Sequence, residues 1–224
     1  MLFRSTPSVI TTEFVKGIKI SDLDRLDDAG LDRKVITHRG ANILLRQVFE
    51  HGFFQADPHP GNIFVLADNV ICLIDFGMVG TVDRKNKEYF VDLIHSVVHQ
   101  DAQRTAQVIL KLTYWDQEPD TRLFEKEVAD FMMHHLHRPL KDIRIGRLLQ
   151  QLLDLASRNQ LRIQADIFLM LKALTTVEGV ARMLDPDFNM IAEATPFIQK
   201  VYINRYAPQR IAEELVRLTA ELKL

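Results

Sequence analysis

The chain has 224 residues, of which 47% are hydrophobic and 26% are charged, a composition typical of folded globular proteins. Its 28 basic and 30 acidic residues give a formal net charge of −2, which argues against a surface built to neutralise nucleic-acid phosphates. The single cysteine excludes an internal disulfide, and no apolar run approaches the roughly 20 residues of a membrane span. The N-terminus also lacks a secretory signal, so we expect a cytoplasmic protein without a nucleic-acid partner.

The N-terminal region carries strand, helix and turn signals in quick succession. Residues 9–15 are rich in β-branched and aromatic side chains and are followed by Gly17, which predicts a strand. Apolar residues recur with helical spacing over 32–50, and Gly52 follows as the left-handed cap that ends many helices. We therefore expect one strand and one amphipathic helix before residue 52.

An irregular loop and a hairpin come next. Residues 55–62 contain two prolines and a glycine, which are incompatible with a helix and stiffen the backbone. The apolar runs 63–66 and 70–74 flank the turn residues 67–69 and predict a β-hairpin. Asp75-Phe76-Gly77 follows the second strand directly.

From residue 83 onward the apolar residues recur with helical periodicity. We expect a mostly helical α+β fold in a single domain. Its parts are a strand region at 1–16, a helix, loop and hairpin at 17–83, and a helical subdomain at 84–224.

Three polar residues in this framework have the types and order that phosphoryl transfer uses. Asp57 and Asn62 bracket the proline-rich loop, and Asp75 begins D-F-G, so the spacing matches the lower half of a protein-kinase-like site. A carboxylate can orient the proton of a nucleophile, and carboxylate and amide oxygens are hard ligands suited to Mg²⁺. The alternative is that these residues only form turns and caps.

The same residues lie in a distinctive string. G-F-F-Q-A-D-P-H-P-G-N over 52–62, with L-I-D-F-G-M-V-G over 73–80, resembles the UbiB/AarF family of atypical kinases. These protein-kinase-like proteins are associated with ubiquinone and other isoprenoid-lipid pathways. A-D-P-H-P-G-N separates the chain from ordinary protein kinases, whose loop carries H-R-D. The resemblance implies the large lobe of a kinase-like fold. Residues 9–51 then correspond to the hinge strand and to the helix before the catalytic loop.

The resemblance also implies roles and ligands. Asp57 corresponds to the catalytic base, and Asn62 and Asp75 correspond to the ligands of Mg²⁺ bound with ATP. The backbone of Glu13, Phe14 and Val15 corresponds to the hinge that faces adenine.

His59, within the loop, is expected either to contact a phosphate or to pin the loop by a hydrogen bond.

The sequence departs from the family pattern in two ways. Gln55 stands where many relatives carry His. More importantly, the chain contains no G-x-G-x-x-G, no G-x-x-x-x-G-K and no V-A-I-K-like strand, and only eight residues precede the predicted hinge strand. We therefore expect the nucleotide-binding small lobe to be missing, as in a truncated chain, a split gene or a degenerate relative.

Two functions follow as hypotheses. The first is an atypical kinase or ATPase that uses Mg-ATP in quinone or isoprenoid-lipid metabolism and works with a small lobe supplied in cis or in trans. The second is a non-catalytic binding or regulatory module that retains the motif for stability or weak nucleotide binding. The resemblance implies an isoprenoid lipid or a quinone-pathway protein as a further partner. The amphipathic segment 211–222 is expected to pack in the core, and the alternative is peripheral membrane contact.

Overall fold

The computed structural model describes residues 8, 9, 11, 13–136 and 144–205. In this part of the chain the fold is mainly helical, with three small antiparallel sheets. The helices are α1 (Leu23–Asp28), α2 (Arg33–Arg46), α3 (Arg84–Val98), α4 (Ala102–Leu112), α5 (Thr121–His135), α6 (Ile145–Arg158), α7 (Ala165–Leu184) and α8 (Met190–Arg205). The strands are β1 (Ile18–Lys19), β2 (Phe53–Gln55), β3 (Ile63–Leu66), β4 (Val70–Leu73), β5 (Val79–Thr81), β6 (Thr113–Tyr114) and β7 (Arg162–Ile163). This confirms the predicted mostly helical α+β class.

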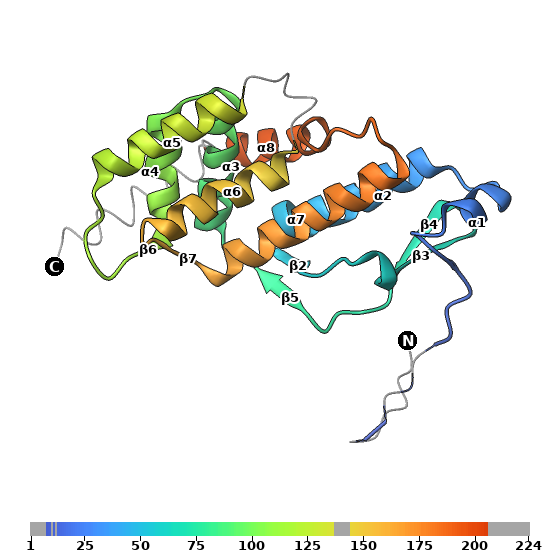
Figure 1. Cartoon of the computed structure of the whole chain (residues 1–224). Coiled ribbons are helices and arrows are strands. Elements are labelled where there is room, and N and C mark those ends of the chain that lie inside the picture. Colours follow the sequence, from blue (N-terminus) through green and yellow to red (C-terminus); the bar gives the residue numbers. More distant parts are fainter. Residues whose placement is uncertain (1–7, 10, 12, 137–143, 206–224) are drawn as a thin grey trace.

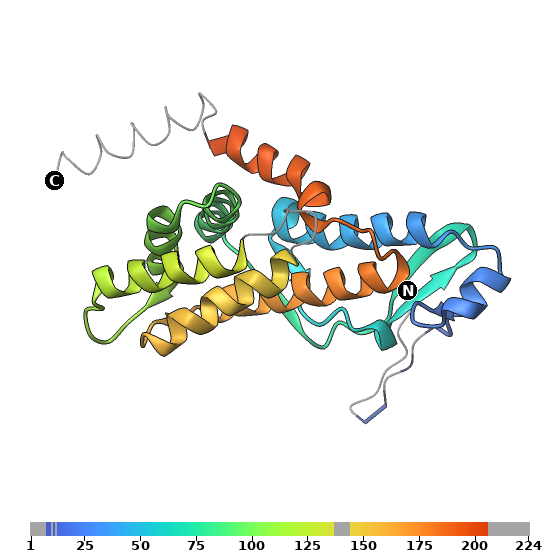
Figure 2. The same ribbon diagram turned by 45° about the horizontal axis from the view of Figure 1, so that its top comes forward.

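Helices α2 and α7 run side by side through the middle of the molecule (Figures 1 and 2). The β3–β4 hairpin and α1 lie at one end of this pair, and α3 to α6 gather at the other. No helix of the described residues is long and apolar enough to cross a membrane.

Helix α2 confirms the helix predicted before the loop. The carboxylate of Asp32 accepts hydrogen bonds from the backbone N–H groups of Lys34 and Val35, which satisfies donors that the first turn leaves free. At its C-terminal end the helix widens into a π-helical turn at Gln47–His51 and stops at Gly52, whose φ of 69° is left-handed. The chain therefore turns back sharply just before the loop.

The β3–β4 hairpin also forms as predicted, with Ile63 opposite Leu73 and Leu66 opposite Val70. Asp68 and Asn69 adopt positive φ values of 59° and 57° in its turn, which these residue types tolerate better than most. The guanidinium of Arg39 donates to the carbonyls of both residues, and the Asn69 side chain accepts from the N–H of Asp32. These bonds fix the hairpin turn to the beginning of α2.

The prediction of a strand at 9–15 is wrong, because the first strand of the described residues begins at Ile18. Val9 forms an isolated bridge, residues 13–15 have no regular secondary structure, and residues 10 and 12 lie outside the described residues. The strand β1 lies further along and pairs antiparallel with β3. A Cβ at Gly17 would come within 3.1 Å of the Val65 carbonyl, so the glycine permits the close approach that begins this pairing. Contact with β3, more than local β propensity, decides where the strand forms.

The β2–β5 pair was not predicted, and it joins the two segments that carry the site residues. Phe54 of β2 lies opposite Gly80 of β5 and is fully buried. A Cβ at Gly80 would come within 2.4 Å of the Phe54 ring, so only glycine fits above it. The pairing thereby holds the start of the loop against the segment that follows Asp75-Phe76-Gly77.

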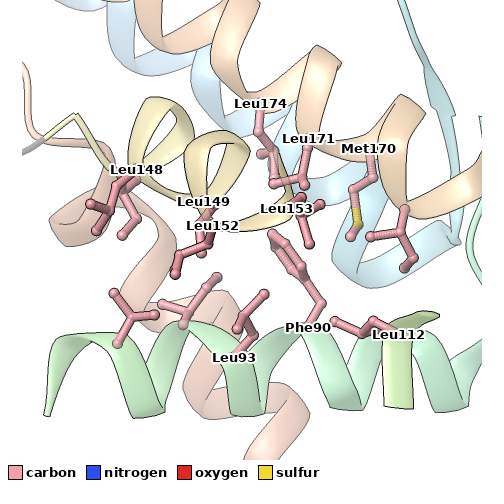
Figure 3. Packing of buried hydrophobic residues seen from close by; sticks show 14 of the residues in the cluster. Phe90, Leu93, Leu112, Leu148, Leu149, Leu152, Leu153, Met170, Leu171 and Leu174 are labelled. Carbon is pink, nitrogen blue, oxygen red and sulfur yellow. The ribbon is translucent and has the colours of Figure 1, made fainter. Parts of the chain in front are cut away.

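The largest hydrophobic core lies among α2 to α7 and extends to α8. Figure 3 shows its centre, where Phe90 of α3 and Leu112 of α4 face Leu149 and Leu152 of α6 and Leu171 of α7. The helical periodicity predicted from residue 83 onward thus corresponds to buried faces of α3, α6 and α7, although Phe168 of α7 is 51% exposed. Burial of such side chains, at about 1.5–3 kcal/mol each, gives α7 a fixed place against the rest of the fold.

A buried carboxylate joins α6 to α7. Glu178 is 3% exposed, and one of its carboxylate oxygens accepts a hydrogen bond from the N–H of Gly146 at 3.0 Å, near the N-terminus of α6. The other oxygen lies 4.0 Å from the Arg182 guanidinium. Burial raises the pKa of Glu178, although the Gly146 hydrogen bond and Arg182 act in the opposite direction.

Two glycine substitutions test the close approach at β5. We expect Gly80→Ala to destabilise the fold by about 1–3 kcal/mol because the buried Phe54 ring cannot move aside. Gly179→Ala, on an exposed helical position with no atom within 4 Å of the new Cβ, is the control and should stabilise by about 0.5–1 kcal/mol. Urea unfolding measures both, and equal effects would contradict the proposed fit.

The buried Glu178 predicts a pH-dependent effect. Because its folded-state pKa is raised, its contribution to stability is fully present below its ordinary pKa and is lost as pH rises through the raised value. The stability of Glu178→Gln relative to the wild type should therefore improve as the pH of urea unfolding rises from about 4 to 7. Glu178→Ala should lower the free energy of unfolding by about 1–3 kcal/mol, since the Gly146 N–H then lacks its hydrogen-bond partner. If the difference in stability between Glu178→Gln and the wild type does not change with pH, the pKa of Glu178 is not raised in the folded protein.

Candidate functional site

The hairpin brings Asn62 and Asp75 side by side, although thirteen positions separate them in sequence. The N–H of Ile74 donates to the carbonyl of Asn62 at 3.1 Å, which extends the β3–β4 pairing by one step. The Asn62 side-chain amide then donates to one carboxylate oxygen of Asp75 at 3.2 Å, and the Gly77 N–H donates to the other at 2.8 Å. Asp75 is exposed and Asn62 is half-buried, so the two side chains remain accessible from solvent.

These two residues fit a magnesium ion better than a metal held mainly by the protein. A carboxylate and an amide carbonyl supply two hard oxygen donors at one place, and Mg²⁺ commonly keeps its other positions for water and phosphate oxygens. Within the described residues, no group of three or more His, Cys, Asp or Glu side chains is arranged to hold a metal ion. The donor set therefore suits a metal that arrives together with a phosphate ligand.

Asp57 lies on the adjoining loop, directly after β2. The N–H of Ala56 donates to the carbonyl of Met78 at 3.0 Å, so the β2–β5 pairing extends to the residue before Asp57. The Asp57 carboxylate is about half-exposed and lies 3.4 Å from the ammonium group of Lys172, which comes from α7. The loop thus presents a carboxylate that has a lysine from a distant helix against it.

His59 takes part in the structure of its own loop. Its Nδ1 accepts a hydrogen bond from the N–H of Gly61 at 3.1 Å and caps the short 3₁₀ turn Pro60–Asn62. This is the loop-pinning role that the sequence left open beside a phosphate contact. The ring is exposed, so a phosphate contact stays a prediction.

The sequence did not single out Gln55 as a site residue, yet it holds the site together. Its side chain is buried, its N–H donates to the Gln47 side chain at 3.1 Å, and its amide donates to the backbone carbonyl of Asp75. Gln55 therefore connects α2, the loop and the Asp75 segment. The departure from His at this position was the one available signal, because an imidazole N–H could also donate to that carbonyl.

Glu13, Phe14 and Val15 line a separate open groove of about 930 Å³. Its other walls come from α1, β3 and Ile74, the residue before Asp75. Phe14 is 83% exposed and the three residues form no strand, so the regular hinge strand predicted here is absent from the described residues.

Comparison with known proteins identifies the family of the chain. The sequence matches a family model described as the ABC1 atypical kinase-like domain over residues 2–109, and a second described as the UbiB helical domain over residues 128–189. The chain belongs to the UbiB/ABC1 family of atypical kinase-like proteins. The resemblance inferred from the A-D-P-H-P-G-N string is thereby confirmed. Asp57, Asn62 and Asp75 lie within the first match, and Lys172 lies within the second.

Individual relatives are longer than this chain. A protein named "Probable protein kinase UbiB" from Xanthomonas campestris pv. campestris (strain B100) is 32% identical over 219 residues, which cover 95% of this chain and 39% of the relative. The protein sll1770 from Synechocystis sp. is 32% identical over 201 residues, which cover 89% of this chain and 34% of the relative. The chain therefore spans about two fifths or less of these curated relatives.

A solved structure shares the fold. The complex of Rv3197 with erythromycin from Mycobacterium tuberculosis aligns with a TM-score of 0.56 and 16% sequence identity, over 88% of this chain and 51% of that one. At this identity the likeness concerns the fold alone.

Gln55→Met tests the role of the buried amide. Methionine fills a similar volume but cannot donate to the Asp75 carbonyl, so we expect faster backbone amide exchange over residues 75–78 and a stability loss of about 1–3 kcal/mol. Hydrogen exchange read by mass spectrometry measures the first effect and urea unfolding the second. Gln103→Met, on the exposed face of α4, is the matched control. Unchanged exchange over 75–78 would show that Gln55 does not hold this segment.

Proposed function

We propose that this chain is the catalytic-loop and metal-binding part of an atypical kinase or ATPase that acts on Mg-ATP in ubiquinone or related isoprenoid-lipid metabolism. The observation that carries the proposal is the contact of Asn62 with Asp75 at 3.2 Å, with Asp57 on the adjoining loop. The family membership and the relatives named as probable UbiB kinases support it.

In this proposal each residue has a defined task. Asp75 and Asn62 hold the magnesium ion through their side-chain oxygens, and the Gly77 N–H keeps the Asp75 carboxylate oriented through its second oxygen. Asp57 accepts or orients the proton of the attacking hydroxyl or water. When bound, Mg²⁺ offsets the negative charge of the phosphate oxygens during transfer.

The frame around these residues supports such a task. Phosphoryl transfer depends on positioning and on charges held in place before the reaction. Here the β3–β4 hairpin positions Asn62 and Asp75, and the β2–β5 pair positions Asp57. The backbone that carries these three residues is therefore held in place before a nucleotide binds.

The remaining contacts with nucleotide and substrate are proposals drawn from the resemblance. Glu13, Phe14 and Val15 supply the adenine-facing wall of the open groove, and a small lobe in cis or in trans supplies the lysine and phosphate loop that this sequence lacks. An isoprenoid lipid or a quinone-pathway protein is the proposed acceptor or partner. The amphipathic segment 211–222, considered for peripheral membrane contact, lies outside the described residues.

Nucleotide binding tests the proposal. A ligand at about ten times its Kd stabilises a protein by about 1.4 kcal/mol, which raises the Tm of a chain of this size by about 3–6 °C. We expect a saturable rise with Mg-ATP in a thermal-shift assay and its loss in Asp75→Asn. Asp68→Asn, in the exposed hairpin turn, is the matched control and should keep the rise.

Two outcomes separate the hypotheses. No saturable shift at millimolar Mg-ATP would contradict the proposed function. The non-catalytic binding module would be favoured by a thermal shift that depends on Asp75 without any phosphate release from ATP. Phosphate release is measured both with the chain alone and after addition of a small-lobe protein.

A further inference from the structure

Lys172 connects the helical subdomain to the candidate active site. It projects from α7, and its ammonium nitrogen lies 3.4 Å from a carboxylate oxygen of Asp57 and 3.7 Å from the sulfur of Met78. Asp57 precedes the metal-binding residues on the loop, and Met78 directly follows Asp75-Phe76-Gly77. Lys172 therefore lies between the two segments that carry the chemistry, although it belongs to the region matched by the UbiB helical domain.

The stability of the fold does not explain this position. The side chains of Lys172 and Asp57 are 37% and 42% exposed, and ion pairs of such exposure are worth about 0–1 kcal/mol. Lys200 and Glu50 form a comparable pair on α8 and α2's π-helical turn, at 2.8 Å and remote from the site. Both are solvent-accessible lysine–carboxylate pairs, although Lys200 is 62% exposed and Lys172 is 37% exposed, and only the first places a cation on a candidate catalytic carboxylate.

The charges of the site indicate why a lysine is needed there. Asp57 and Asp75 contribute two carboxylates, Asn62 is neutral, and the Nδ1 of His59 already accepts a hydrogen bond from its own loop. A phosphate that binds near both carboxylates is repelled by their negative charges. Among the described residues, Lys172 is the basic side chain that pairs with either of these carboxylates.

The anchoring of Lys172 suits a positioning role. Its backbone carbonyl accepts a hydrogen bond from the Thr176 hydroxyl at 2.8 Å, and the neighbouring Leu171 and Ala173 are buried in the core. The start of the side chain is thus fixed by α7, while its flexible stem lets the ammonium group move between neighbouring anions. A lysine of this kind acts as a mobile point charge toward phosphate.

We infer that Lys172 is a basic residue of the active site, additional to the lysine of the small lobe, and that it orients Asp57 in the free protein and binds the terminal phosphate of the nucleotide. This inference rests on the proposed function and adds the helical subdomain to the catalytic machinery. ADP lacks the terminal phosphate, so Lys172 should contribute to the binding of ATP and little to that of ADP.

Equilibrium binding of Mg-ATP and Mg-ADP to the chain tests the inference. Lys172→Met should weaken ATP binding by about ten- to a hundredfold, which is the range for a hydrogen bond to a charged group, with little change for ADP. Lys172→Arg keeps the charge and should restore ATP binding to within a few fold. Lys200→Met removes the comparable remote pair and should bind both nucleotides as the wild type does.

The possible results are distinguishable. A wild-type chain that binds neither nucleotide would overturn the proposed function and this inference with it. Wild-type binding with the same ATP-to-ADP ratio in Lys172→Met would overturn the inference alone. Thermal unfolding should give similar Tm values for Lys172→Met and Lys200→Met, and Lys172→Gln replaces Lys172→Met if the latter does not fold.

Discussion

The hydrogen bond from the N–H of Ile74 to the carbonyl of Asn62 is the constraint on which the site depends. It exists because the β3–β4 hairpin has one register, in which Ile63 faces Leu73. A slip of one residue would turn alternate side chains to the opposite face and separate Asn62 from Asp75. The turn at Asp68 and Asn69 and its bonds to Arg39 and Asp32 fix that register from the far end. The placement of Asn62 next to Asp75 is thus determined by contacts at both ends of a four-residue strand pair.

The parts of the site that could be predicted from the sequence are those specified by neighbouring residues. The hairpin follows from two short apolar runs around a turn, and the end of α2 follows from Gly52. Asn62 precedes the first strand of the predicted hairpin and Asp75 follows the second, so the two residues are expected at the same end of it. The strand at 9–15 shows the limit, because its composition favours a strand while the pairing with β3 begins only after Gly17.

The parts that could not be predicted depend on contacts between distant segments. The β2–β5 pair consists of short strands whose partners lie more than twenty residues apart, so neither has a clear local pattern. Gln55 and Glu178 are polar residues of a kind expected on the surface, yet both are buried because each donates to or accepts from a backbone group that would otherwise be unpaired. Lys172 occupies an ordinary position on a long helix, and only the packing of α7 brings it to Asp57.

Different residues of helix α7 contact the core, the start of α6 and the loop that carries Asp57. Leu171 and Leu174 pack into the core shown in Figure 3, Glu178 accepts from the first turn of α6, and Lys172 faces the loop. Because a helix is rigid, the core contacts that hold α7 fix the position of all its residues. They therefore also determine where the Lys172 ammonium group can reach. Helix α7 therefore joins the helical subdomain to the loop, and its packing in the core sets the distance between Lys172 and Asp57.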